Sequence, residues 1–140
     1  MSLKVQLVHE NAKEPIRMSN GAAGYDLFAV ESVVIPARGT CKVNTGICIT
    51  VPPGTYGRIA PRSGLAVKGV DVGAGVIDHD FTGVVHVVLY NHSDVEIEIK
   101  SGDRCAQLIL ECIKVCPVEV VDKLAVTDRG EAGFGSTGPY

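Results

Sequence analysis

The sequence lacks an excess of positive charge, a pair of cysteines in C-x-x-C spacing, and any apolar run long enough to cross a membrane. Its 13 lysines and arginines stand against 16 aspartates and glutamates, which gives a net charge of −3. Because general binders of nucleic acid or anionic membranes are basic, we expect neither nucleic acid nor a membrane as a partner. Any recognition of phosphate must therefore be local.

The five cysteines are odd in number, which favours neither a disulfide framework nor a common zinc site. Most lie among apolar residues, as Cys48 does between two isoleucines and Cys112 beside Ile113. A cysteine in such surroundings usually serves as a small core side chain. We expect reduced thiols and, since no signal peptide is recognisable, a cytoplasmic or nuclear location.

Length and composition suit a single domain with a packed core. The chain has 140 residues, of which 46% are hydrophobic and 21% are charged, the balance of a globular protein. No linker or repeat divides it, so we predict one domain over residues 1–140. Within this domain we expect a β core over residues 1–126 and a glycine-rich C-terminal lid over residues 127–140.

Short β-rich runs separated by Gly, Pro, Asn and Asp predict an all-β fold. Residues 84–90 are almost entirely apolar, as in a strand covered on both faces, and residues 95–99 alternate apolar with charged side chains. Only residues 64–68 favour a short helical turn. Many short strands with a turn about every ten residues are typical of a sandwich, jelly roll or barrel, and the strand order stays open. The other expected strands cover residues 3–7, 33–35, 47–51 and 106–112.

The last part of the sequence, residues 129–138, combines an arginine, an aromatic ring and two hydroxyls with several glycines. Residues 133–138 match G-x-G-x-x-G, which can mark a dinucleotide site. That site needs a helix after the glycines, and only two residues follow in this sequence, so we do not expect a dinucleotide fold. Two interpretations stay open, a disordered terminus and a lid that orders over a phosphate-bearing ligand.

Four further polar segments lie between the expected strands. Within the second of them, Arg62-Ser63-Gly64 supplies a cation, a hydroxyl and an unobstructed backbone N–H, a combination that suits an anion. Taken singly, each segment indicates little, because Asp26 can simply cap a turn and Arg104 can pair with a nearby carboxylate. The four segments cover residues 22–27, 57–66, 75–83 and 102–107.

Together with the C-terminal segment, in this order and spacing, they resemble the five motifs of the homotrimeric dUTPase family. The likeness runs from about Ala22 to Gly138. It implies an all-β, distorted jelly-roll or β-clip-like barrel, assembled as a homotrimer whose C-terminal arms are exchanged between subunits. The most specific matches are Arg58-Ile59-Ala60-Pro61-Arg62-Ser63-Gly64, Gly75-Val76-Ile77-Asp78 and Gly133-Phe134-Gly135-Ser136-Thr137-Gly138.

The resemblance also implies the reaction, which is hydrolysis of dUTP to dUMP and pyrophosphate at sites built from three subunits. Such a reaction limits uracil in DNA and supplies dUMP for dTMP synthesis. Asp78 would be the base that orients a water for in-line attack on the α-phosphate. Asp26 would lie near a Mg²⁺ cofactor and reach it through water, with the metal held mainly by the triphosphate.

The same resemblance assigns the substrate contacts. The phosphates would be bound by Arg62, Ser63, Gly64, Gln107, Arg129, Gly135, Ser136 and Thr137. The base and the sugar would be bound by Gly75, Val76, Ile77, Asp78, Phe81, His86 and Phe134. Main-chain groups of the hairpin would read the edge of uracil, and the ring of Phe134 would stack on it.

Several residues depart from the commoner family pattern. Phe81 stands where tyrosine is usual, which keeps the ring that blocks a ribose hydroxyl and loses the hydrogen bonds of the phenol. Thr82 replaces a frequent arginine, and Val84 replaces a frequent acid or amide. His86 stands where a glycine often lets the base approach, and we expect it to be tolerated if its ring points away. These departures concern efficiency and base affinity rather than the class of reaction.

Two other functions stay open. A dCTP deaminase of the related family would share the fold but would need further polar groups around the cytosine amine. A dUTPase-like module that binds a nucleotide or a protein without turnover is the non-enzymatic alternative, and the presence of Asp78 and Arg129 argues against it. His79 invites a role as an acid or a metal ligand, and we favour a solvated or hydrogen-bonded imidazole instead.

Overall fold

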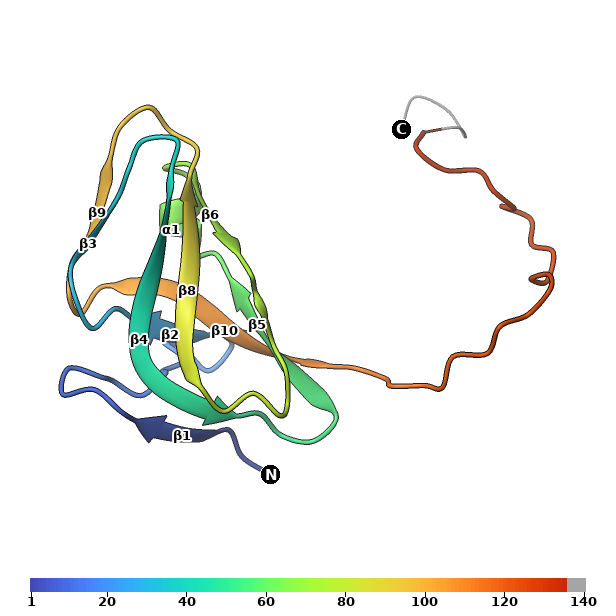
Figure 1. The fold of residues 1–140 in the computed structure, drawn as a ribbon, viewed down its shortest axis with the longest axis horizontal. Helices are drawn as coiled ribbons and strands as arrows, with labels where there is room; N and C mark the ends of the chain where they lie inside the picture. The colour runs from blue at the N-terminus through green and yellow to red at the C-terminus, as the bar shows by residue number, and fades with distance from the viewer. Residues whose placement is uncertain (136–140) are drawn as a thin grey trace.

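The computed structural model describes residues 1–135 and consists of two packed four-stranded sheets and a small two-stranded one (Figure 1). The first sheet has the order β1-β4-β8-β6, from β1 (Lys4–Leu7), β4 (Thr40–Thr50), β8 (Val84–Asn91) and β6 (Val70–Gly73). The second has the order β2-β10-β5-β7, from β2 (Tyr25–Phe28), β10 (Arg104–Cys112), β5 (Thr55–Ala60) and β7 (Val76–Ile77). The third pairs β3 (Val33–Ile35) with β9 (Ile97–Ile99). Every pairing is antiparallel, and the all-β prediction is confirmed.

The core lies between the two large sheets. Val43, Ile47 and Leu89 from the first sheet meet Leu27 and Leu108 from the second, and each is at most 1% exposed. Full burial of one such side chain stabilises the fold by about 1.5–3 kcal/mol. The two sheets therefore form one rigid body, from which the loops that carry the predicted site residues project.

One face of β8 is less covered than the sequence predicted. Val85, Val87 and Leu89 are buried, whereas the residues between them are only half-buried. The apolar sequence of this strand suits a strand that is covered on both faces. One copy of the chain fully covers only one of these faces.

A bulge in β4 bends the strand where its register with β8 shifts, between Asn44 and Cys48. Gly46 has a φ of +67° there, and a Cβ at this position would lie 2.7 Å from the Cβ of His9. Glycine is therefore required. The first half of β4 pairs along β8 and the second half with β1, and Figure 1 shows the strand turning between them.

The β9 strand is shorter than the alternation over residues 95–99 predicted. It begins at Ile97, and Val95 is 67% exposed in the bend that precedes it. The side chain of Asn91 explains the difference, because its amide donates to the carbonyl of Val95 at 2.8 Å and to that of Ile35 at 3.2 Å. These bonds close the bend and compete with extension of the strand.

All five cysteines are free, as predicted. Cys105 is buried, and burial raises the pKa of its thiol to about 12. The expectation that Cys112 lies in the core is wrong. It is exposed at the end of β10, where the second sheet stops, and Cys116 beyond it is exposed as well.

The helical turn predicted over residues 64–68 is present as α1 (Ser63–Ala66). It is the one helix within residues 1–135. No helix in this part of the chain has the length and hydropathy that crossing a membrane requires.

Residues 113–135, called the arm below, leave the body without regular secondary structure (Figure 1, orange to red). The last hydrogen bond between arm and body within the described chain joins the amide of Ile113 to the carbonyl of Gly54 at 3.0 Å. Apolar side chains further along are almost fully exposed, 92% for Val118 and 93% for Val120. The division between core and lid at residue 126 stays a prediction.

Candidate active site

The described residues with predicted roles fall into three separate groups. The first lines an apolar hollow of about 290 Å³ between β7 and β8. The second surrounds a polar hollow of about 330 Å³ beside α1. The third lies on the arm. In Figure 1, β8 begins at the lower end of the body, and α1 lies near the other end of this strand. The end of the arm lies far from both.

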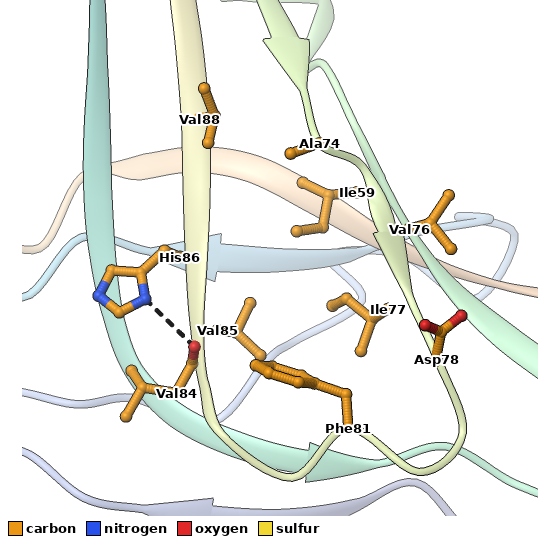
Figure 2. A pocket seen from close by; sticks show the side chains of 10 residues that line it. All are labelled: Ile59, Ala74, Val76, Ile77, Asp78, Phe81, Val84, Val85, His86 and Val88. Atoms are coloured by element: carbon orange, nitrogen blue, oxygen red, sulfur yellow. Dashed lines mark hydrogen bonds between the residues drawn. The ribbon is translucent and has the colours of Figure 1, made fainter.

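The apolar hollow is lined by five of the residues predicted to bind the base and the sugar, Val76, Ile77, Asp78, Phe81 and His86 (Figure 2). The amide of Ile59 on β5 donates to the carbonyl of Gly75 at 2.8 Å, which holds the chain leading into β7 against the second sheet. The ring of Phe81 lies beside Ile77 in Figure 2 and is 46% exposed. Asp78 is exposed at the rim of the hollow, just after β7 ends. In one copy of the chain its carboxylate is therefore in contact with solvent.

The ring of His86 points away from Phe81. Figure 2 shows its ring on the side of β8 toward β4, away from Phe81. Its Nδ1 lies 3.2 Å from the carbonyl oxygen of Val84. The ring therefore leaves the space beside Phe81 open.

Beside the polar hollow, Asp26, whose side chain is 13% exposed, pairs with two arginines that line it. Its Oδ1 lies 3.6 Å from Nε of Arg62, and its Oδ2 lies 3.3 Å from Nη1 of Arg104. Arg62 also donates to the carbonyl of Arg104 at 3.3 Å. A guanidinium has five N–H donors, so each arginine keeps donors available for an anion. Arg104 thus pairs with a carboxylate, one of the roles that its sequence allowed.

Gln107 connects three of the polar segments. It lies opposite Asp26 on one side of β10 and opposite Ala60 on the other. Its amide donates to the carbonyl of Pro61 at 2.9 Å. A Cβ on Gly24 would collide with its Oε1. Gly24 therefore leaves room for Gln107 to reach the loop before Arg62. The sequence indicated a turn of small residues here but not this positioning role.

Ser63 and Gly64 form the first turn of α1 and are exposed. Arg62 is the N-cap residue, with an extended backbone (φ −86°, ψ 141°) and no hydrogen bond from its side chain to the helix. The amides of Leu65 and Ala66 both donate to the carbonyl of Arg62. Within residues 1–135, the Ser63 hydroxyl makes no hydrogen bond, and neither do the amides of Ser63 and Gly64.

The third group lies at the end of the arm. Nε of Arg129 donates to the carbonyl of Ala132 at 2.7 Å, so within residues 1–135 this guanidinium is held only by its own turn. Phe134 is fully exposed. Gly135 is the last described residue, and the predicted phosphate contacts Ser136 and Thr137 lie outside the described residues.

The donor set suits an indirect metal role for Asp26. Residues 1–135 contain no group of three or more His, Cys, Asp or Glu side chains that could together hold a metal ion. Both oxygens of Asp26 face guanidinium groups. A carboxylate in this setting fits contact with the water shell of a Mg²⁺ that is bound mainly by substrate phosphates.

A further cluster fixes the end of β10, where the arm begins. The hydroxyl of Tyr56 donates to Oε2 of Glu111 at 2.6 Å, and Nη1 of Arg58 lies 3.2 Å from Oε1. The Tyr56 hydrogen bond, followed by that of Arg58, holds the pKa of Glu111 below its usual value. The same bond raises the pKa of Tyr56.

The chain is similar to known proteins over almost its whole length. The dUTPase family model matches residues 10–138. A deoxyuridine 5'-triphosphate nucleotidohydrolase from Kluyveromyces lactis is 58% identical over 139 residues, which cover 98% of this chain and 94% of that protein. The dUTPase of Staphylococcus bacteriophage 80alpha, solved with dUPNHPP, has a TM-score of 0.93 at 27% identity and covers 98% of each chain. A variant dUTPase from phage phi11 of S. aureus, with a structural Mg(II) ion, has a TM-score of 0.82 at 25% identity, covering 88% of this chain and 98% of that one.

Proposed function

Because the chain belongs to the dUTPase family, we propose that it hydrolyses dUTP to dUMP and pyrophosphate at sites shared between three copies of the chain. Family membership makes it a dUTP diphosphatase, an enzyme of nucleotide metabolism. The relatives support neither a dCTP deaminase nor a binding module without turnover. In the cell the reaction would limit uracil in DNA and supply dUMP for dTMP synthesis.

The separation of the three groups of residues carries the proposal of a shared site. On this proposal a single nucleotide contacts the apolar hollow, the polar hollow and the arm. In one copy of the chain α1, the start of β8 and the end of the arm lie apart (Figure 1). An arm with side chains such as Val118 and Val120 almost fully exposed needs a surface to cover it. A head-to-tail contact between copies, closed into a ring of three, would supply both the surface and the missing parts of each site.

In this assembly Asp78 would accept a proton from a water placed in line with the bond to be cleaved. The water oxygen bonds to the α-phosphorus as the bond to the bridging oxygen breaks, and pyrophosphate leaves with that electron pair. Arg62, Ser63 and Gly64 would hold the phosphate oxygens, with Gln107 near the α-phosphate. These groups are preorganised, since Asp26 orients Arg62 and Gly24 leaves room for Gln107.

Arg129 would clamp the γ-phosphate from the arm, and Gly135 with the two residues after it would complete the phosphate contacts. When bound, Mg²⁺ would neutralise charge on the triphosphate, and Asp26 would contact its water ligands. The phage phi11 relative with a structural Mg(II) ion supports a divalent metal in this family. The relative supports the presence of a divalent metal only. The proposed contact of Asp26 with the water ligands of the metal is argued from the position of its carboxylate between Arg62 and Arg104.

Base and sugar would be selected in the apolar hollow. Main-chain groups from Gly75 to Asp78 would read the edge of uracil, and Phe134 from an arm would stack on its face. Phe81 would cover the deoxyribose, so that a ribose hydroxyl would meet carbon without a hydrogen-bond partner. Such an unsatisfied hydroxyl costs about 1–3 kcal/mol. We therefore expect dUTP to be hydrolysed in preference to UTP.

Two variants that are inactive alone test the shared site. Asp78→Asn removes the base and Arg129→Ala removes the phosphate clamp, and each is expected to lose about 100-fold or more in turnover. When the two are co-expressed in equal amounts, turnover should return to about a quarter of wild type, because that share of sites then combines an intact hollow with an intact arm. Pyrophosphate release from dUTP measures the outcome.

The matched control is Asp78→Asn co-expressed with a chain that carries both substitutions, a mixture that should stay inactive. If the first mixture is no more active than its components, the base hollow and the arm belong to the same chain and the shared site is wrong. If Asp78→Asn alone keeps full turnover, the assignment of the base is wrong.

A further inference from the structure

The loop between β7 and β8, residues 78–83, carries both the proposed base Asp78 and the sugar contact Phe81. β7 pairs with β5 only at Val76 and Ile77, so the ladder stops one residue before Asp78. Figure 2 shows Asp78 just beyond the end of β7 and Phe81 in the loop that leads to β8. The sheet alone therefore does not fix the Asp78 carboxylate.

Within residues 1–135, one hydrogen bond joins this loop to the rest of the chain. Nδ1 of His79 lies 2.9 Å from the carbonyl oxygen of Val51. The other hydrogen bond of the loop is internal, from the amide of Phe81 to the carbonyl of Asp78 at 3.1 Å. The residue next to the proposed base is thus the one that attaches its loop to the body.

The acceptor of this bond is held in a rigid part of the body. Val51 is 1% exposed and follows the last residue of β4. Two prolines come next, and their rings fix the backbone torsion φ. The amide and the hydroxyl of Thr55 both donate to the carbonyl of Pro52, at 3.3 and 2.7 Å. A loop attached at Val51 is therefore attached to a turn that is itself well fixed.

The bond to Val51 needs a donor but no particular charge. A carbonyl oxygen only accepts, so Nδ1 of His79 must carry a hydrogen. The imidazolium and the Nδ1–H form of the neutral ring both supply one. The amide nitrogen of an asparagine takes nearly the same place as Nδ1, because it is separated from Cβ by one atom in both side chains. An asparagine at this position can therefore keep the hydrogen bond to Val51 although the imidazole ring is absent.

We propose that His79 is a positioning residue, which holds the loop of residues 78–83 against Val51 so that Asp78 keeps its orientation at the rim of the hollow. The inference rests on the proposed function, since it takes Asp78 as the base. A displacement of about 1 Å at a reacting group lowers a rate by as much as 100-fold. The sequence favoured a solvated or hydrogen-bonded imidazole at His79 over an acid or a metal ligand, and the bond to Val51 gives that imidazole a task.

Three single variants of the full chain test this role. His79→Ala removes the attachment, His79→Asn keeps a donor, and His92→Ala is the control. His92 is an exposed histidine after the far end of β8, stacked on Tyr90 with ring centroids 6.4 Å apart. For dUTP, His79→Ala should lower kcat by about 10- to 100-fold with a smaller change in KM. His79→Asn should restore most of kcat, and His92→Ala should leave it unchanged.

Hydrogen exchange at the Phe81 amide gives a readout that does not depend on catalysis. It should be faster in His79→Ala than in wild type and near wild type in His79→Asn. Unchanged kcat in His79→Ala, or an equal loss in the alanine and asparagine variants, would overturn the positioning role. Asp78→Asn is measured alongside: if that variant keeps turnover, the proposed base is wrong, and unchanged exchange at Phe81 in His79→Ala would still refute the attachment.

Discussion

The body of residues 1–112 and the arm of residues 113–135 place the same kinds of side chain in opposite surroundings. Val43 and Val87 in the body are 0% exposed, whereas Val118 and Val120 in the arm are 92% and 93% exposed. Apolar composition therefore does not by itself put a residue in a core. A valine is buried only where another surface lies opposite it, and the described chain offers the arm no such surface.

The charged groups differ in the same way. In the body, Asp26 pairs with both Arg62 and Arg104, and Arg62 also donates to the carbonyl of Arg104. In the arm, as far as the chain is described, Arg129 is held only by the carbonyl of Ala132, three residues further along. The body thus presents donors that are already oriented, while the arm has to be ordered when it binds. Ordering costs about 1–2 kcal/mol of backbone entropy per residue, which contacts with substrate and with a neighbouring copy must offset.

Removing residues 127–140 should separate the two regions most sharply. The truncated protein should lose about 1,000-fold or more in kcat/KM for dUTP, because a phosphate-clamping arginine contributes that much to phosphoryl transfer. The body should keep its thermal unfolding midpoint, since no hydrogen bond within the described chain joins the arm to it beyond Ile113. Pyrophosphate release and circular dichroism measure the two quantities. A truncated body that unfolds well below the full chain would contradict the comparison.

A matched pair of leucines tests burial directly. Leu89 is 0% exposed in the core and Leu124 is 81% exposed in the arm. Leu89→Ala should lower the free energy of unfolding by about 2–5 kcal/mol at every protein concentration. Leu124→Ala should act only on the associated protein, so its effect should depend on protein concentration. Urea unfolding at a low and a high concentration distinguishes them, and equal, concentration-independent losses would place Leu124 in a core of its own chain.

Much of the body was predictable because local pattern and tertiary structure agree there. The alternation before residue 8 gives β1, and the small residues after Arg62 give α1, one residue earlier than predicted. The first half of β4 was not predicted, because it contains polar residues such as Thr40 and Lys42, which are exposed, and it is a strand through its pairing with β8. Cys112 was wrongly placed in the core, since an apolar neighbourhood in sequence does not reveal where a sheet ends.

The residues of the candidate site were predictable by type and not by arrangement. Motif spacing named Asp26, Gln107 and Asp78, but it did not reveal that the first two lie opposite each other on neighbouring strands, or that the third lies at the apolar hollow. The tasks of Gly24 and His79 depend on contacts with Gln107 and Val51, residues remote in sequence. No local pattern encodes such a contact, because it exists only once the strands have paired.

The smallest expected effect concerns the junction between body and arm. Tyr56 and Arg58 lower the pKa of Glu111, so the ionised carboxylate stabilises the fold above the ordinary glutamate pKa of about 4.3 and this contribution is lost as pH falls through the lowered value. The urea midpoint of Glu111→Gln should therefore lie slightly below that of wild type at pH 7 and converge with it in acid. The control Glu119→Gln, on the arm, should show no such convergence. If the urea midpoints of Glu111→Gln and wild type differ by the same amount down to strong acid, the charge of the carboxylate contributes nothing to stability at this junction. Packing and uncharged hydrogen bonds would then fix the point where the arm leaves the body.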